Sequence, residues 1–104
     1  MYSLDEYQKF CRSTAVYPDD EVTIYPTLGL VSEAGEVAGK LKKMIRDGGD
    51  HTASMATELG DVLWYVAILA EDLGFTLSQI AQMNVSKLID RASRGTIQGS
   101  GDYR

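Results

Sequence analysis

A short acidic pattern occurs twice in this chain, and it constrains the fold more than any other feature. Residues 33–37 read EAGEV, and residues 58–62 read ELGDV. Each copy places two carboxylates three residues apart, a spacing that puts both on one face of a helix. If two such helices face each other, their carboxylates converge. Like charges gather in this way around a counter-ion, and Mg²⁺ is a hard divalent cation that prefers oxygen ligands.

The composition indicates one ordinary globular domain. The chain has 104 residues, of which 44% are hydrophobic, and its formal net charge is −5. That charge argues against a protein that wraps a nucleic acid polymer, because such proteins present a basic surface. It leaves nucleotides open as ligands, since a bridging metal can hold their phosphates.

The sequence also bears on the compartment of the protein. Its single cysteine, Cys11, excludes an intramolecular disulfide and lies on an apolar stripe, so we expect a buried structural thiol. No apolar run is expected to span a membrane, and the first residues are too polar for a signal peptide. We therefore expect a cytoplasmic protein with no membrane partner.

Helical periodicity predicts an all-α fold, a compact bundle of about four helices that assembles as an oligomer. Capping boxes are predicted at Ser3 and Thr76. A single domain of residues 1–94 precedes a glycine-rich tail, 95–104, which is expected to be irregular unless a ligand or a neighbouring subunit pins it. Oligomerisation is expected because a chain this short buries limited apolar area. The predicted helices span residues 4–17, 26 to 45 or 46, 52–73, and 77 to about 91–93.

The two helices that carry the acidic pattern present matching polar edges. Glu33 and Glu36 lie beside the apolar face of the second helix, and Glu58 and Asp61 lie at the equivalent edge of the third. One such pair is usually a solvated helix face, whereas two pairs at equivalent edges favour a metal site. All-carboxylate ligation suits Mg²⁺, with Mn²⁺ as a substitute.

A glycine lies between the two carboxylates of each pair. Gly35 and Gly60 occupy helix interiors, where glycine costs about 0.5–1 kcal/mol relative to alanine. Close approach of a neighbouring backbone or a ligand would offset this cost, and we expect it at both positions. The alternative is that single glycines inside helices are tolerated without a role.

Composition argues against two other kinds of metal site. A ferritin-like di-iron site needs two Glu-x-x-His pairs, but the chain has a single histidine, His51. A tetrahedral zinc site is equally unsupported. We interpret His51 as a surface residue near the start of a helix.

The fourth helix offers groups that suit phosphate. Asn84 lies within its apolar stripe, where a polar side chain needs a partner, and Lys87 and Arg91 follow along the adjoining edge. A metal-bound polyphosphate would meet an amide donor and cations there. The alternative is that Lys87 and Arg91 form a solvated face near the helix C-terminus.

Three aromatic residues near the acidic pattern each have two interpretations. Trp64 is expected to point away from the core stripe, which favours a subunit interface over a contact with a nucleobase. Tyr25 and Tyr65 are candidates for a base pocket, and ordinary packing is the alternative for both.

Taken together, these residues resemble the MazG-like all-α nucleoside triphosphate pyrophosphohydrolases. The resemblance implies a helical bundle that works as a homodimer or homotetramer. It implies Mg²⁺-dependent cleavage of a nucleoside triphosphate between the α- and β-phosphates, which yields a nucleoside monophosphate and pyrophosphate. By match of position, it places Glu33, Glu36, Glu58 and Asp61 on the metal, and Lys43, Asn84, Lys87 and Arg91 on the phosphate side. The similar segments are 29–37, 42–47, 60–65, 84–91 and 99–104.

One position departs from the family pattern. Many members have a further glutamate just before the first acidic pair, and this chain has Ser32 there. If that acid is the general base elsewhere, this chain uses Glu36 or Glu33 instead, or activates water through the metal alone. Two other hypotheses therefore remain open. One is a non-catalytic helical oligomer that binds nucleotide or metal, and the other is a purely structural oligomer with solvated carboxylates.

Overall fold

The computed structural model describes residues 1–104, apart from the side chain of Asp19. The described part of the chain forms helices and no strand, which confirms the predicted all-α class. One turn of 3₁₀ helix lies between the first and second predicted helices. The elements are α1 (Leu4–Thr14), η1 (Asp19–Glu21), α2 (Ile24–Asp47), α3 (Thr52–Asp72) and α4 (Leu77–Ser93).

Local signals set several of the helix boundaries. The capping boxes predicted at Ser3 and Thr76 both form, each with reciprocal hydrogen bonds between the cap and the third helical residue. Helix α1 ends at Thr14, earlier than the predicted Tyr17, because Ala15 adopts an extended conformation. The other predicted boundaries lie within about two residues of those observed, which is the usual uncertainty at helix ends.

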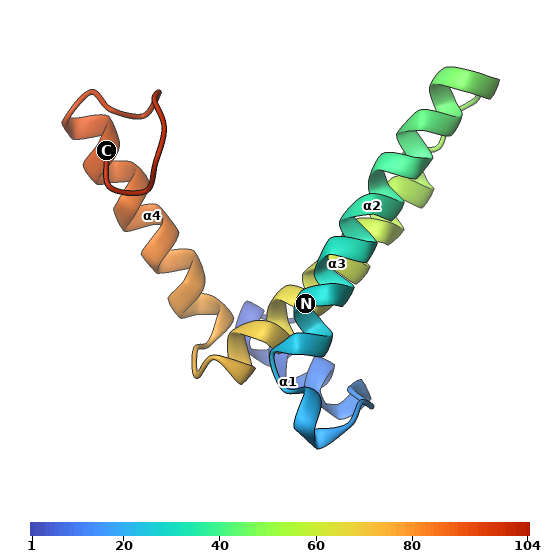
Figure 1. Ribbon diagram of the computed structural model, residues 1–104, viewed down its shortest axis with the longest axis horizontal. Coiled ribbons are helices and arrows are strands. Elements are labelled where there is room, and N and C mark those ends of the chain that lie inside the picture. Colours follow the sequence, from blue (N-terminus) through green and yellow to red (C-terminus); the bar gives the residue numbers. More distant parts are fainter.

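Helices α2 and α3 form a long antiparallel hairpin, and α4 diverges from it (Figure 1). The hairpin turns at Gly48 and Gly49, whose φ angles of 75° and 89° favour glycine. A second turn at Gly74, with φ of 90°, directs α4 away from the hairpin. The Cα radius of gyration is 16.4 Å, whereas a compact domain of this length has about 13 Å. Within one chain, the four helices therefore do not close into a compact bundle.

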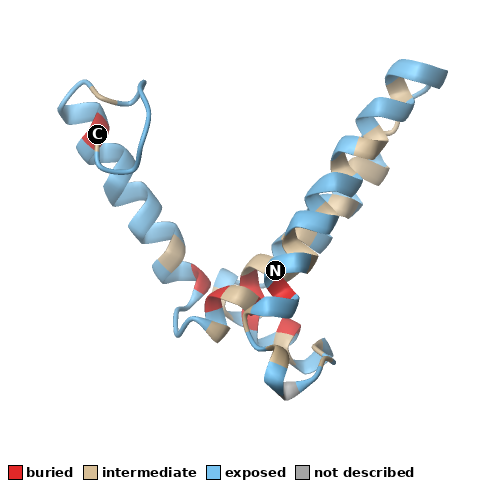
Figure 2. Ribbon diagram, in the orientation of Figure 1, coloured by how far each residue is buried: buried red, intermediate tan, exposed pale blue. Residues whose placement is uncertain are grey.

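The α2–α3 hairpin and the diverging α4 form two arms. The core is small and lies where these two arms meet (Figure 2). The buried Gln8 side chain joins the helices there, since its amide nitrogen donates to the carbonyl oxygens of Ala67 and Phe75, at 3.0 Å each. Its amide oxygen accepts from the N–H of Leu77 at 3.1 Å. These bonds satisfy the buried amide and tie α1 to α3 and to the start of α4. The buried residues that form this core cluster are Cys11, Ala67, Ile68, Ala70 and Leu77.

Much of the predicted apolar surface is exposed along the two arms. Helical spacing of the apolar residues predicts core stripes at these positions, but each arm has neighbours on only part of its circumference. A helical period identifies an apolar face without showing whether the same chain covers it. The exposed members of the predicted stripes include Leu41, Ile45, Leu59, Leu73, Val85 and Leu88.

A network centred on Asp72 holds the junction of the helices. The Asp72 carboxylate, whose side chain is 6% exposed, accepts from Arg12 Nη2 at 2.7 Å and from the Tyr17 hydroxyl at 2.9 Å. It also accepts from the N–H of Thr23 at 3.1 Å. Thr23 has φ of 69°, a conformation that costs energy in a β-branched residue. Asp72 therefore stabilises a strained entry into α2.

The expectation that no segment could span a membrane is not met by helix α3. By length and composition alone, Thr52–Asp72 is apolar enough to do so. Core helices of soluble proteins pass the same test. In this chain α3 packs along α2 and carries Glu58 and Asp61, which are costly in hydrocarbon. The absence of a membrane partner stays a prediction.

Candidate active site

Three carboxylates from the two copies of the acidic pattern come together between α2 and α3. One carboxylate oxygen each from Glu33, Glu58 and Asp61 lies within 4.8 Å of the other two. Glu33 and Glu58 are partly buried, and Asp61 is exposed. The antiparallel hairpin produces this arrangement, because it sets the acidic edge of α2 against that of α3. We refer to these three residues as the acidic cluster.

The electrostatics of the acidic cluster are unfavourable without a cation. Partial burial raises the pKa of Glu33 above its usual value, and the carboxyl group of Glu58 raises it further by hydrogen bonding and by charge. The charges of Asp61 and Glu36 act in the same direction. Repulsion of this kind favours either a shared proton or a bound cation.

Glu36, the fourth predicted metal ligand, lies outside the acidic cluster. It is exposed on α2, although its charge still affects Glu33. Glu33 and Glu36 are three residues apart on one helix face, so Glu36 borders the cluster without converging on it.

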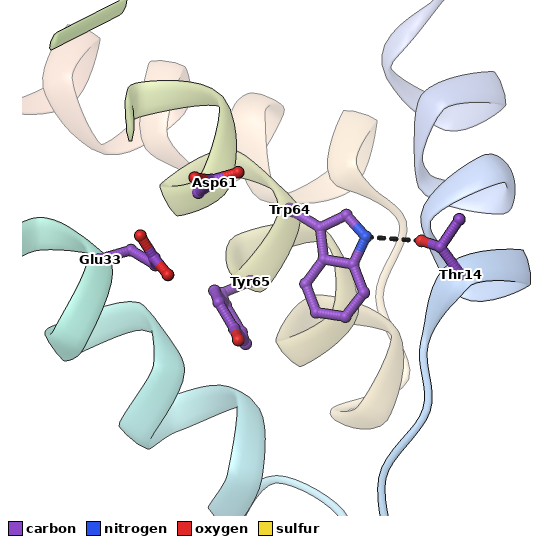
Figure 3. A pocket seen from close by; sticks show the side chains of 5 residues that line it. All are labelled: Thr14, Glu33, Asp61, Trp64 and Tyr65. Atoms are coloured by element: carbon purple, nitrogen blue, oxygen red, sulfur yellow. Dashed lines mark hydrogen bonds between the residues drawn. The ribbon is translucent and has the colours of Figure 1, made fainter. Parts of the chain in front are cut away.

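A cavity of about 330 Å³ adjoins the acidic cluster, and it is lined by aromatic as well as acidic side chains (Figure 3). Trp64 donates from its indole N–H to Oγ1 of Thr14 at 2.8 Å, which joins α3 to α1 across one side of the cavity. The prediction that Trp64 points away from the core is wrong, because it is half-buried and packs against the core residues. The lining residues are Thr14, Glu33, Asp61, Trp64 and Tyr65.

The two tyrosines proposed for a base pocket belong to one row of aromatic rings. Tyr25 stacks on Tyr17 with nearly parallel rings, whose centroids are 5.0 Å apart and whose planes differ by 8°. Tyr25 and Tyr65 are tilted at 46° with centroids 6.5 Å apart, and the edge-on contact between Tyr65 and Trp64 extends the row. The row therefore runs from the Asp72 network to the cavity and offers flat apolar surface beside the carboxylates.

Sequence reasoning missed Thr14 as a cavity residue. Thr14 lies at the end of α1, far from the acidic pattern in sequence, and nothing in its neighbourhood marks it as functional. For Trp64 a signal was present, because it follows Asp61 by three residues and so shares a helix face with it.

The surroundings of the glycines inside the helices differ from the prediction. A Cβ atom added at Gly35 or Gly60 would meet no atom within 4 Å in the described structure. The expected close approach of a neighbouring backbone is therefore wrong at these two positions in the single chain, and close approach of a ligand stays a prediction. Within the chain, close approach occurs instead at Gly29, where an added Cβ would overlap the Tyr65 ring. The absence of a side chain at Gly29 allows the ring to lie against α2.

The predicted phosphate-side residues are distant from the acidic cluster within one chain. Lys43 is exposed on α2, ten residues after Glu33 and hence about 15 Å further along the helix axis. Asn84 and Lys87 line a shallow groove on α4, the arm that diverges from the hairpin. Arg91 is 5% exposed, and the C-terminal tail covers it.

Comparison with known proteins identifies the family. A model of the MazG nucleotide pyrophosphohydrolase domain matches residues 25–95. The chain belongs to this family. It is also 46% identical to the Gene 37 protein of Mycobacterium phage L5, in an alignment that covers 97% of this chain and 98% of the relative. No solved structure matches the chain.

The MazG match covers both copies of the acidic pattern and all of α3 and α4. It leaves out α1 and residues 96–104. The cavity of this MazG protein therefore includes Thr14, a residue outside the matched segment. The tail also lies outside the match.

The donor set of this MazG chain fits a hard divalent cation. The acidic cluster supplies carboxylate oxygens from two helices, close enough together for one ion to contact all three residues. The groups that shift the pKa of Glu33 electrostatically are all acidic, so a cation would relieve their repulsion. His51 precedes α3 at the far end of the hairpin and is not a member of the acidic cluster.

Proposed function

We propose that this MazG protein is a Mg²⁺-dependent nucleoside triphosphate pyrophosphohydrolase. The reaction adds water at the α-phosphorus and breaks its bond to the oxygen that bridges to the β-phosphorus. The products are a nucleoside monophosphate and pyrophosphate. The observation that supports this proposal is the convergence of Glu33, Glu58 and Asp61 beside a cavity lined by aromatic rings.

In this proposal Glu33, Glu58 and Asp61 hold the metal, with Glu36 as the fourth ligand at the edge of the site. Bound Mg²⁺, or Mn²⁺ in its place, would neutralise the triphosphate and lower the pKa of a coordinated water. Since Ser32 offers no carboxylate, Glu33 or Glu36 accepts the proton of the attacking water.

The nucleoside portion is proposed to bind along the aromatic row. Tyr65 borders the acidic cluster and lines the cavity, and Tyr25 lies beside it. Flat rings next to a triphosphate site suit stacking on a base, which contributes about 1–3 kcal/mol in single-stranded nucleic acid complexes. Tyr25 and Tyr65 are therefore proposed as substrate-binding residues.

We propose a homodimer or homotetramer, because one chain leaves too much surface uncovered. The accessible surface is 7311 Å², whereas a folded monomer of this mass exposes about 5,800 Å². The excess of about 1,500 Å² per chain is about twice the roughly 800 Å² that each partner buries in a standard interface, and it lies in the range of obligate homodimers. Exposed apolar residues lie along both arms.

A second copy would also supply the phosphate side of the site. Within one chain α4 diverges from the acidic cluster. We therefore propose that Asn84, Lys87 and Arg91 of one copy lie near the carboxylates of another, where positive charge complements negative charge. Lys43 remains a candidate from the same hairpin.

The primary test is a substrate panel. The protein is incubated with Mg²⁺ and different nucleoside triphosphates, and release of pyrophosphate and nucleoside monophosphate is measured. Asp61→Asn should lower kcat/KM by at least about 100-fold. Asp47→Asn is the control, because it removes the same charge from an exposed pair with Arg46 at the end of α2.

The substrate panel also separates the hypotheses. Equal activity of the wild type and the Asp61→Asn and Glu36→Gln variants would defeat the assignment of the metal site. Ser32 supports a second candidate function, a non-catalytic binding module. Mg²⁺-dependent nucleotide binding without any product would favour that candidate.

Subunit complementation tests whether the site is shared between copies. Asp61→Asn and Lys87→Gln subunits are each expected to be inactive when assembled alone. If each site combines residues from two copies, a remixed dimer of both variants in equal amounts regains about a quarter of the wild-type activity. No recovery after verified subunit exchange would show that Asp61 and Lys87 do not act in different subunits.

A further inference from the structure

The C-terminal tail is a closed loop built around the side chain of Arg104. Its guanidinium donates to the carbonyl oxygens of Thr96, Ile97 and Gly101, at 3.1, 2.8 and 2.7 Å. Gly99 allows this closure, because it has φ of 128° and an added Cβ would lie 3.0 Å from the Arg104 side chain. The tail is therefore a defined structure rather than a frayed end.

The loop is attached to α4 through its main chain. Arg91 Nη2 donates to the carbonyl oxygen of Asp102 at 2.9 Å and makes a longer contact to that of Gly101 at 3.4 Å. Arg94 Nη2 donates to the terminal residue, at the main-chain oxygen of Arg104, at 2.6 Å. These main-chain bonds do not use the Asp102 side chain, so they remain when that side chain is replaced.

This attachment sets the Asp102 carboxylate against two cations. Its Oδ1 lies 3.6 Å from Lys87 Nζ and 3.5 Å from Arg91 Nη2. The charge of Lys87 and a hydrogen bond from Arg91 lower the pKa of Asp102, so the carboxylate is ionised at neutral pH. The Asp102 side chain is 80% exposed, and exposed ion pairs at such distances are weak. The Asp102 carboxylate therefore lies beside both cations but can be replaced there by another anion.

We propose that Asp102 is an internal competitor for a phosphate site formed by Lys87 and Arg91, so that a polyphosphate must displace its carboxylate in order to bind. The ligand class is a di- or triphosphate anion, free or carried by a nucleotide. The inference rests on the proposed function for the assignment of Lys87 to phosphate. Because the loop stays attached through Arg91 and Arg94, displacement moves only the Asp102 side chain.

The test measures the affinity of the wild type and of variants for inorganic pyrophosphate. The titrations are followed by phosphorus NMR, without metal and at low ionic strength. Asp102→Asn should bind pyrophosphate about two- to five-fold more tightly than the wild type, the gain expected from release of an exposed ion pair. Asp20→Asn is the matched control, since it removes the same charge at an exposed position away from the tail. It should leave the affinity near the wild-type value.

The role of Lys87 is tested in the same titration. Lys87→Gln should weaken binding, and the Asp102→Asn/Lys87→Gln double variant should not show the gain seen with Asp102→Asn alone. An Asp102→Asn affinity equal to that of Asp20→Asn, or weaker than the wild type, would overturn the proposal. So would a double variant that keeps the full gain.

This outcome is separable from that of the proposed enzyme activity. Pyrophosphate binding needs neither metal nor turnover, so the Asp102 effect can hold in a protein that hydrolyses nothing. An active wild-type enzyme whose pyrophosphate affinity does not respond to Asp102→Asn would overturn this inference alone.

Discussion

Glu33 on α2 and Glu58 on α3 place carboxylate oxygens within 4.8 Å of each other, together with an oxygen of Asp61. The two residues are 25 positions apart in the sequence, and the hairpin makes them neighbours. Their proximity raises the pKa of Glu33 beyond the effect of partial burial. The metal-free fold therefore carries a local electrostatic cost that a divalent cation would remove.

Glu33→Gln should make the metal-free protein more stable at neutral pH and abolish its stabilisation by Mg²⁺ or Mn²⁺. The substitution removes one of the converging charges and one ligand oxygen. In the wild type, a cation at about 100 times its dissociation constant should contribute about 2.7 kcal/mol. Thermal unfolding with and without metal measures both effects. Equal metal stabilisation of the variant and the wild type would contradict the assignment of Glu33 as a ligand.

Asp72→Asn should destabilise the fold by about 3 kcal/mol, because it weakens the buried network that holds Arg12, Tyr17 and Thr23. Urea unfolding measures the change. Glu71→Gln is the control, since Glu71 pairs with the same arginine but its side chain is 42% exposed. Its cost should stay within about 1 kcal/mol. Equal costs for the two variants would contradict a special role of Asp72.

The same network should make stability sensitive to acid. Burial alone would raise the pKa of Asp72, but hydrogen bonds from Thr23, Arg12 and Tyr17 lower it below its usual value. The stabilisation from Asp72 is then present above its ordinary pKa of 3.8 and is lost as the pH falls through the lowered value. Between about pH 5 and pH 2, the wild type should lose more stability than Asp72→Asn. Parallel stability curves would contradict this prediction.

Gly29→Ala should cost about 1–3 kcal/mol, because the added methyl group displaces the Tyr65 ring. Gly35→Ala is the matched control on the same helix. Its methyl group meets open space, so better helix propensity should stabilise the protein by about 0.5–1 kcal/mol. Chemical denaturation distinguishes the two results. A loss of stability in Gly35→Ala would indicate a contact at this position in the assembled oligomer.

Trp64 should report ligand binding by fluorescence, because it is the single tryptophan of the chain and lines the cavity. Addition of a nucleoside triphosphate with Mg²⁺ should shift or quench its emission. Thr14→Val should alter the emission of the free protein, since it removes the acceptor of the indole N–H. An unchanged spectrum at saturating nucleotide would place the ligand away from this cavity.

The local parts of the structure could be predicted because short-range chemistry determines them. The capping boxes at Ser3 and Thr76 depend on residues three positions apart. The meeting of the acidic edges of α2 and α3 depends on one tight turn between two helices of known period. Such features can be predicted without knowing where the rest of the chain lies.

The features that were missed depend on distant partners. An apolar stripe does not reveal whether the same chain or a second copy covers it, so the divergence of α4 was not predicted. The sequence also does not distinguish Gly29, which faces a ring, from Gly35, which faces open space. Burial of Arg91 arises from the returning tail, an irregular segment whose path no helical period describes.

The turn at Gly74 controls the direction of a whole helix. Its φ of 90° is accessible to glycine but strained for other residues. Because a helix is stiff, a small change in the backbone angles of Gly74 would move the far end of α4 over a large distance. Relatives that share every functional side chain could thus differ in quaternary geometry through this short link, and evolution could alter the assembly without touching the chemistry.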